Sequence, residues 1–299
     1  MDDWSDELMC AGVTVTHGVS GALLTTFGSG GKMDLLAPRE VDGVRASLEA
    51  LIRAKVPYRV IGGGSNLLLP DEDYRGALLS LSRLSSLAVA GHLLTADAGV
   101  RLPLLAKRAA EMSLSGLEFA SGIPAEVGGA VKCNAGAFGQ MISDVLASVI
   151  VMDAEGKVDV LGAEEISAGY HTCHIPEGRV ILSAVFALRE GDRAEIEERM
   201  RVMRSRRRAT QPTERSAGSV FRRVADTPAA VYIERTGLKG YRVGGAELST
   251  VHCNFIVNRG GATTADYFAV AERVRERVRE QSGVTLEYEV ERICSPRNS

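Results

Sequence analysis

The feature that most constrains this chain is residues 116–139, which contain six glycines, several small side chains and one proline. A glycine destabilises a helix or a strand by roughly 0.5–1 kcal/mol relative to alanine, so this composition predicts neither element. Glycine permits a positive φ and close backbone approach, which lets main-chain N–H groups surround an anionic ligand. A glycine-rich surface loop is the alternative. A buried ligand-binding loop is favoured because the stretch also carries apolar residues that solvated linkers lack, namely Leu117, Phe119, Ile123, Val127, Val131 and Phe138.

A second glycine-rich turn, Gly62-Gly63-Gly64-Ser65-Asn66, directly follows the β-rich run 58–61. It lacks the dinucleotide-binding pattern G-x-G-x-x-G, because Leu67 stands where the third glycine belongs. No G-K-[ST] follows the glycines, which excludes a Walker loop. Two interpretations stay open at this point, an ordinary turn and a loop whose amides hold a pyrophosphate. The second glycine-rich stretch downstream favours the pyrophosphate.

The length of 299 residues predicts two or three domains. A net charge of -3 gives no general attraction to nucleic acid or to a membrane surface. The five cysteines are scattered and form no C-x-x-C pair, which is typical of free thiols in a reducing compartment. The acidic N-terminus has no signal-peptide pattern, and no run of 18 apolar residues occurs. We therefore expect a cytoplasmic protein with no nucleic-acid or membrane partner.

Hydrophobic periodicity predicts helices at residues 41–55, 102–112, 193–209, 230–236 and 263–281. A hairpin is expected over 145–161, with Glu155-Gly156 at its turn. Further strands are predicted at residues 23–27, 33–36, 58–61, 67–69, 78–81, 87–90, 93–96, 180–188, 254–258 and 286–290. A carboxylate on the last of these strands points either into a site or into water, and alternation alone does not decide which.

The helix at 193–209 ends in the basic run 204–208, Arg-Ser-Arg-Arg-Arg. Such a run is usually a solvated face, and the acidic net charge argues against a nucleic-acid site. One or two of the arginines could instead bind a small anionic substrate. Gln211-Pro212 closes the helix and marks the expected domain boundary.

Several motifs occur in an order that resembles the UDP-N-acetylenolpyruvoylglucosamine reductases, the MurB family of FAD-dependent enzymes of bacterial peptidoglycan synthesis. The resemblance runs from about residue 20 to residue 293. The motifs that carry it are Gly62–Leu68, the block Ser121–Gly136, Gly218-Ser219-Val220-Phe221, Gly237-Leu238-Lys239-Gly240, Gly244-Gly245-Ala246 and Leu286-x-Tyr288-Glu289-Val290.

This resemblance implies an α+β fold, with a two-lobed FAD-binding domain of the vanillyl-alcohol-oxidase (PCMH) type followed by an α+β substrate-binding domain. The implied division is 1–85 for the first FAD-binding lobe, 86–210 for the second lobe and 211–299 for the substrate domain, as in the smaller type of the family. No histidine lies between residues 17 and 92, so we expect FAD to be bound non-covalently. The implied cofactor-binding residues are Ile61, Gly62, Gly63, Gly64, Ser65, Asn66, Leu67, Ser121, Gly122, Ile123, Pro124, Val127, Gly128, Gly129, Asn134, Ala135 and Gly136.

The implied activity is reduction of UDP-N-acetylglucosamine enolpyruvate with NADPH as the hydride donor. Hydride adds to the β-carbon of the enol ether, and the adjacent α-carbon gains enolate character and must then be protonated. The implied catalytic residues are Ser219 as the acid, Glu289 beside the enolate, and His171. Candidates for holding the substrate are Tyr170, Arg207, Arg222, Lys239 and Asn254.

Two departures from the family pattern matter. The family usually has Tyr-Arg-x-Ser where this chain has Tyr170-His171-Thr172-Cys173, and the spacing from Gln211-Pro212 to Ser219 is one residue shorter than usual. Histidine supplies a positive charge only when protonated, so a shifted substrate on the same scaffold is an alternative, as is a paralogue that binds flavin or sugar nucleotide without turnover. Side chains so close on a strand alternate faces, so we expect no metal site at 170–174. A monomer is expected.

Overall fold

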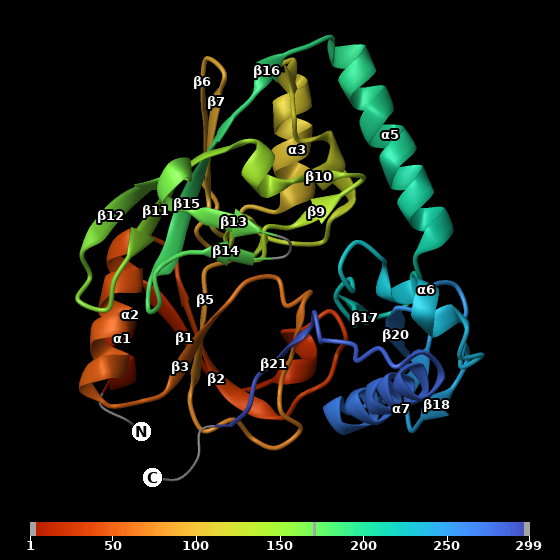
Figure 1. Ribbon diagram of the computed structural model, residues 1–299. Helices are drawn as coiled ribbons and strands as arrows, with labels where there is room; N and C mark the ends of the chain where they lie inside the picture. The colour runs from red at the N-terminus through yellow and green to blue at the C-terminus, as the bar shows by residue number, and fades with distance from the viewer. Residues whose placement is uncertain (1–3, 170–171, 296–299) are drawn as a thin grey trace. The chain divides into compact units, whose positions relative to one another are not determined.

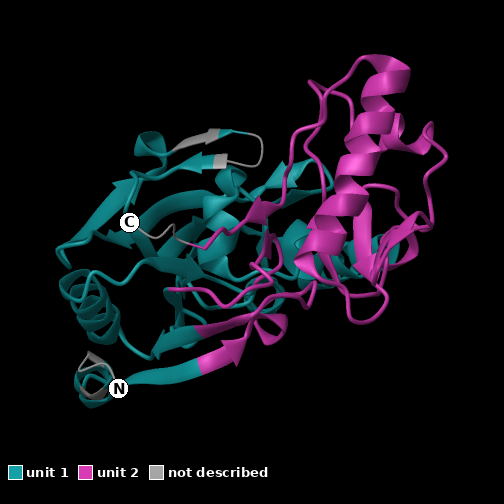
Figure 2. Cartoon of the chain, turned by 90° about the horizontal axis from the view of Figure 1, so that it is seen from below, with its two compact units in different colours: residues 1–17, 34–63, 76–207 teal, residues 18–33, 64–75, 208–299 magenta. Residues whose placement is uncertain are grey.

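In the computed structural model, which describes residues 4–169 and 172–295, the chain divides into two units that are each built from several segments (Figure 2). Unit 1 comprises residues 1–17, 34–63 and 76–207. Unit 2 comprises residues 18–33, 64–75 and 208–299. The three-part division expected from the sequence, 1–85, 86–210 and 211–299, stays a prediction.

The first sheet of unit 1 has the strand order β1-β2-β5-β3 (Figure 1). Strands β2 and β3 both run parallel to β5, which lies between them. Parallel strands of one sheet are joined by a crossover, and α2 provides the crossover from β2 to β3. All four residues of β5 are buried, as is typical of a strand covered on both faces. The elements are α1 (Trp4–Cys10), β1 (Val13–Ser20), β2 (Lys32–Pro38), α2 (Val41–Arg53), β3 (Tyr58–Ile61) and β5 (Ala77–Ser80).

The second sheet of unit 1 is antiparallel, with the order β12-β11-β15-β7-β6. It confirms the predicted hairpin: Asp153 Oδ1 accepts hydrogen bonds from the N–H groups of Glu155 (3.1 Å) and Lys157 (2.8 Å), and Gly156 takes φ 78. The sheet strands are β6 (Leu87–Ala90), β7 (Leu93–Asp97), β11 (Leu146–Met152), β12 (Val158–Gly162) and β15 (Val180–Ala187).

Short elements complete unit 1. The helix α3 (Leu102–Glu111) packs against the 3-10 turn η2 (Glu118–Gly122), and α4 (Val127–Lys132) packs against β15. Three two-stranded ladders join β8 (Leu114–Ser115) to β16 (Arg189–Glu190), β9 (Gly136–Ala137) to β10 (Gln140–Met141), and β13 (Ser167–Gly169) to β14 (Thr172–His174). The other 3-10 turns are η3 (Ile142–Asp144) and η4 (Ala163–Glu165).

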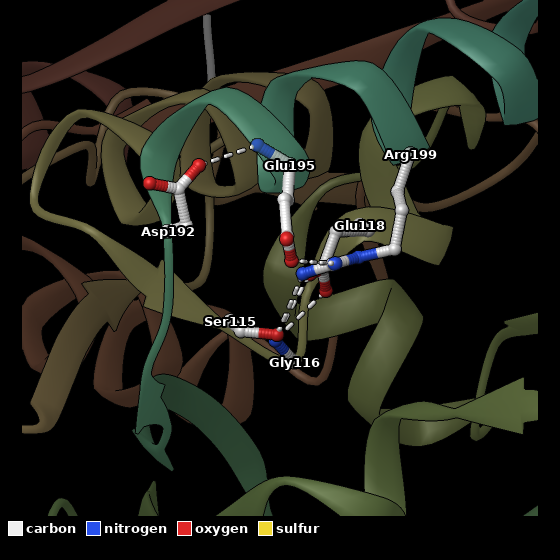
Figure 3. Close-up of polar contacts among 6 residues, drawn as sticks. All are labelled: Ser115, Gly116, Glu118, Asp192, Glu195 and Arg199. Carbon is white, nitrogen blue, oxygen red and sulfur yellow. Dashed lines mark hydrogen bonds and ion pairs between the residues drawn. The ribbon is translucent and has the colours of Figure 1, made fainter.

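The long helix α5 (Arg193–Thr210) is mostly exposed, and a polar cluster holds it to the segment that opens the glycine-rich stretch (Figure 3). Glu118 is only 5% exposed and accepts hydrogen bonds from Arg199 Nη2 (2.8 Å), Ser115 Oγ (2.7 Å) and Gly116 N (2.8 Å). Burial alone would raise the pKa of Glu118, but these hydrogen bonds outweigh burial and hold the pKa below its ordinary value. The carboxylate therefore favours folding in its charged form.

Arg199→Ala is expected to lower the free energy of unfolding by about 2–3 kcal/mol at neutral pH, because a nearly buried carboxylate loses its counter-ion. Urea unfolding measures the change. The difference should shrink in acid, as the pH falls through the lowered pKa of Glu118 and the carboxylate is protonated. Arg201→Ala is the matched control on the same helix, since its partner Glu198 is exposed, and its midpoint should stay near that of the wild type. Equal effects of the two changes would contradict the role given to Glu118.

Unit 2 is built on a sheet of order β17-β20-β19-β18, against which α7 packs. The helix α7 begins at a capping box of Thr263 and Asp266, and the Asp71 carboxylate also accepts from the N–H groups of Thr264 (2.7 Å) and Ala265 (2.8 Å). Strand β4 (Leu67–Leu68) pairs in parallel with β21 (Glu291–Arg292). The remaining elements are η1 (Gly21–Leu23), β17 (Ser216–Ser219), α6 (Ala229–Glu234), β18 (Arg242–Val243), β19 (Ala246–Leu248), β20 (Phe255–Asn258) and α7 (Thr264–Ser282).

Three expectations for secondary structure are wrong. Residue 23 ends η1 and residues 24–27 form a turn and bends, in which Thr26 donates its N–H to Gly64 O (2.9 Å). Residues 286–290 form no strand, because their partner is the turn 220–222 and only the bridge Phe221↔Tyr288 forms. The glycine-rich stretch contains the helix α4, whose residues Val127, Ala130 and Val131 are buried at helical spacing and offset the cost of its two glycines.

Of the apolar residues expected to anchor the stretch, Phe138 is 40% exposed and the others are buried. No helix in the described ranges is long and apolar enough to cross a membrane.

Candidate active site

The two glycine-rich segments lie against each other in unit 1. Strand β3 ends at the buried Ile61, and Gly62 and Gly63 follow it beside Glu126, which precedes α4. A Cβ placed on Gly62 would lie 3.5 Å from Glu126 Oε2 and 3.9 Å from Gly129 N. A Cβ on Gly63 would lie 3.8 Å from Glu126 Cγ. The Gly62-Gly63 turn, which follows β3 of the parallel sheet, therefore lies beside the start of α4 in the second glycine-rich segment.

Some of these glycines are required by the chain itself and others are not. Gly64 has φ 63, and a Cβ there would lie 2.0 Å from Leu24 O, so no other residue fits. A Cβ on Gly128 would lie 3.0 Å from Ala98 Cβ. Gly62, Gly63 and Gly129, by contrast, would meet only ordinary contacts or open space among the described residues. The described residues therefore do not require glycine at these three positions, and its presence leaves the main chain open to a ligand.

Two buried oxygens of the second glycine-rich segment lack a hydrogen-bond partner among the described residues, Ser121 Oγ and Glu126 Oε2. Native proteins seldom leave such atoms unpaired, so each is a candidate ligand contact. Burial raises the pKa of Glu126 to about 7, against the opposing charge of Arg101. The carboxyl group is therefore partly protonated at neutral pH.

Arg207, near the end of α5, lies against Gly122: a Cβ on that glycine would be 3.2 Å from Arg207 Cδ. Burial lowers the pKa of Arg207, and its guanidinium has no ion pair within residues 4–169 and 172–295. A half-buried guanidinium beside a glycine-rich loop suits an anionic ligand such as a phosphate. Of the two interpretations of the basic run, an anion-binding role fits this arginine.

Other residues expected to bind the cofactor have structural contacts. Asn134, with φ 42, is buried; its amide donates to Gly169 O (2.9 Å) and accepts from Ser143 N (2.9 Å). Its side chain therefore shapes the loop 134–143. A Cβ on Gly136 would lie 2.8 Å from Gln140 O. Ala135 N donates to Ala130 O (2.8 Å), Ile123 and Val127 are buried, and Pro124 is exposed.

In unit 2 the segments of Ser219 and Glu289 are joined through the backbone. Glu289 N donates to Val220 O (2.9 Å), one residue from Ser219, and Asn66 Nδ2 donates to Glu289 O (3.3 Å). Gly218 has φ 76 at an irregularity of β17, and a Cβ on it would lie 3.6 Å from Ser65 O. The second half of the first glycine turn, Gly64–Leu67, thus lies beside both candidate catalytic residues within this unit.

Glu289 is mostly buried, which answers the question that alternation left open. Burial raises the pKa of its carboxyl group to about 7, and the charge of Arg222 opposes that rise. Arg222 is fixed by its N–H to Glu287 O (2.9 Å) and by its Nε to Tyr288 O (3.2 Å). A carboxyl group with this pKa can exchange a proton near neutral pH.

The other substrate candidates are placed differently. Asn254 is 6% exposed and uses its amide on Phe221, donating to the carbonyl (2.9 Å) and accepting from the N–H (3.0 Å). It braces the turn that carries Ser219. Lys239 forms an ion pair with Glu234 (2.8 Å). Tyr170 and His171 lie outside the described residues.

One residue of this site escaped the sequence analysis, Glu126. The available signal was its charge, since it is the one acidic residue in the block 121–136 of small and apolar side chains.

Comparisons with known proteins agree with this geometry. Residues 35–162 match the family model described as "FAD binding domain", and residues 211–293 match "UDP-N-acetylenolpyruvoylglucosamine reductase, C-terminal domain". A UDP-N-acetylenolpyruvoylglucosamine reductase of Agathobacter rectalis is 41% identical over 284 residues, 90% of either chain. One from Paramagnetospirillum magneticum is 38% identical over 294 residues, 97% of this chain and 95% of the relative.

Among solved structures, the chain is similar to the crystal structure of UDP-N-acetylenolpyruvylglucosamine reductase (MurB) from Thermus caldophilus. The TM-score is 0.82 at 36% identity, covering 94% of this chain and 99% of that one. Together with the FAD-binding match, this similarity confirms the expected fold class, an α+β FAD-binding domain of the PCMH type followed by an α+β substrate domain.

Proposed function

The chain belongs to the UDP-N-acetylenolpyruvoylglucosamine reductase family, and from this premise we propose how its residues reduce UDP-N-acetylglucosamine enolpyruvate to UDP-N-acetylmuramate with NADPH and FAD. The observation that carries the proposal is the contact of the Gly62-Gly63 turn with Glu126 and Gly129, inside a region that matches an FAD-binding family. The reduction adds one hydride equivalent and one proton across the enol-ether double bond.

The residues of unit 1 fit FAD. Gly62, Gly63 and Gly129 leave the backbone open to a pyrophosphate, and Ser121 Oγ and Arg207 supply a hydroxyl group and a positive charge. When bound, FAD supplies hydride transfer from NADPH to the enolpyruvyl group. In this proposal FAD is bound non-covalently, because the first turn and its flanks contain no histidine to which the flavin ring could be attached.

Ser219 donates the proton to the α-carbon of the enolpyruvyl group. A serine hydroxyl is a weak acid, so transfer depends on a strongly basic, enolate-like carbon and on close alignment. Asn254 provides that alignment, because it fixes both backbone polar groups of Phe221, two residues along the chain. The register irregularity between Ser216 and Ser219 and the positive φ of Gly218 bend β17 just before Ser219, which pairs with Phe255 at the end of the strand.

Glu289 stabilises the negative charge that develops on the substrate carboxylate before the proton arrives. In its protonated form it donates a hydrogen bond to that carboxylate instead of repelling it, which the pKa of about 7 permits near neutral pH. Arg222, whose charge acts on Glu289, adds a positive charge for the same anion. We propose that Tyr170, His171 and Lys239 contact the substrate as well, and that Arg207, expected among the substrate residues, binds the cofactor pyrophosphate instead.

Stopped-flow absorbance of the purified protein tests the function. The protein should show the visible bands of oxidised flavin, NADPH should bleach them, and UDP-N-acetylglucosamine enolpyruvate should restore them rapidly. Bleaching without rapid restoration would favour a flavin oxidoreductase with a shifted substrate. A protein that binds flavin without bleaching would be a non-catalytic paralogue.

A further inference from the structure

Glu126 places a carboxyl group where the proposed function requires room for a pyrophosphate. Its Oε2 would lie 3.5 Å from a Cβ on Gly62, and its Cγ would lie 3.8 Å from a Cβ on Gly63. A charged carboxylate beside two phosphates is strongly unfavourable at such short range. The position is therefore compatible with FAD only if the carboxyl group carries a proton or if a cation lies between the groups.

We propose that Glu126 binds FAD in its protonated form, donating a hydrogen bond to the cofactor pyrophosphate, and that FAD affinity consequently falls as the pH rises above neutral. The inference rests on the proposed function, since it concerns the same cofactor. It assigns Glu126 a role in cofactor binding and makes the affinity of the protein for FAD depend on pH.

The first support is the unpaired oxygen. Glu126 Oε2 is buried and has no hydrogen-bond partner among the described residues, although backbone hydrogen bonds fix the segment on either side of it. The residue forms a bridge with Arg101, its carbonyl accepts from Ala130 N (2.9 Å), and Val127 N donates to Val100 O (2.9 Å). The backbone therefore holds the side chain in place against Gly62 and Gly63, and a protonated oxygen there has a proton to donate.

The second support is the balance of charge around the carboxyl group. The Gly62-Gly63 turn contributes no charged side chain, and α4 carries only Lys132, in its last turn. Arg101, before α3, is the charged group that acts on Glu126 within the described ranges, and it is exposed. Burial prevails over Arg101 and raises the pKa to about 7. A bound pyrophosphate would raise the pKa of Glu126 further, since a like charge disfavours ionisation.

The sign of the effect follows from linkage. FAD binds the protonated form, so binding takes up a proton wherever the free protein has lost it. Affinity is therefore constant below about pH 7 and falls by up to tenfold per pH unit above it, until the bound form also ionises. Between about pH 6 and pH 8.5 the dissociation constant should rise by up to roughly 30-fold.

Glu126→Gln removes the titration and keeps a hydrogen-bond donor. The test is the dissociation constant of FAD, measured by flavin fluorescence on the full-length protein stripped of cofactor, between pH 6 and 8.5 with a metal chelator present. The affinity of the wild type for FAD should fall above about pH 7, by up to roughly 30-fold at pH 8.5. Glu126→Gln should bind FAD equally well across the range, and hence more tightly than the wild type at the alkaline end. Glu126→Ala should bind weakly at every pH.

Two variants serve as controls. Glu49→Gln changes an exposed carboxyl group on α2 and should show the wild-type profile. Glu289→Gln removes the other carboxyl group whose pKa is raised to about 7 and should also keep that profile.

The outcomes separate the inference from the function on which it rests. FAD that binds at pH 6 with an affinity that stays constant up to pH 8.5 overturns the role of Glu126 and leaves the function standing. If FAD affinity no longer depends on pH in Glu289→Gln, the titrating group is Glu289 and the inference about Glu126 is likewise overturned. Alkaline binding restored to the wild type by Mg²⁺ shows a bridging cation instead. Absence of FAD binding at every pH in the wild type overturns the proposed function itself.

Discussion

Ser219→Ala is expected to slow the reoxidation of reduced flavin by UDP-N-acetylglucosamine enolpyruvate by about 10³-fold, while bleaching by NADPH stays near the wild-type rate. The magnitude is that of removing a general acid from a positioned site. Bleaching requires no proton donor on the enolpyruvyl group, so only the second half-reaction should suffer. Stopped-flow absorbance measures the two steps separately.

The matched control for this change is Ser216→Ala, which removes a hydroxyl from the same strand, β17. Its reoxidation rate should match the wild type. Ser219→Cys should recover part of the lost rate, because a thiol is also a proton donor. If Ser219→Ala slowed both half-reactions equally, the residue would be needed for binding or folding and the role as acid would fail.

Glu289→Ala is expected to lower the rate of the same reoxidation step by about 10²–10³-fold, because it removes a donor aimed at developing negative charge. The pKa of about 7 makes the prediction sharper. The wild-type rate should fall as the pH rises through about 7, where Glu289 loses its proton. Glu289→Gln should retain part of the rate and lose this pH dependence. A pH dependence that persisted in Glu289→Gln would show that another group titrates.

Stability gives an independent check on Glu289. Its folded pKa is raised from 4.5 to about 7, so the unfolded chain releases the proton first and stability falls between these two values. Above pH 7 the penalty amounts to up to about 3 kcal/mol, at 1.36 kcal/mol for each pKa unit. Glu289→Gln should therefore have a higher melting temperature than the wild type at pH 8 and a similar one at pH 4. A lower melting temperature at pH 8 would indicate that the carboxylate is stabilised by a partner.

The two glycine-rich segments show which properties of the candidate site the sequence predicted and which it did not. Their residue types predicted main-chain recognition of an anion, because only glycine allows such close approach. The same composition misled the prediction of secondary structure, since α4 forms inside the second segment. Burial of Val127, Ala130 and Val131 stabilises α4 although its glycines have low helix propensity. This stabilisation comes from tertiary packing, which propensity rules based on local sequence do not include.

The 286–290 segment shows the converse error. Leu286 and Val290 are both buried, yet no strand forms. A ladder requires a regular partner strand, and the turn 220–222 forms only one bridge with this segment.

By itself the sequence determined the family, the fold class and the cofactor, because these depend on residue types in a fixed order along the chain. Only the tertiary structure revealed that Glu126 and Glu289 are largely buried glutamates whose pKa values are raised to about 7, and that Asn254 braces the turn of Ser219. The physical reason is that a pKa depends on solvent exclusion and on neighbouring charges, and these come from segments far apart in the sequence.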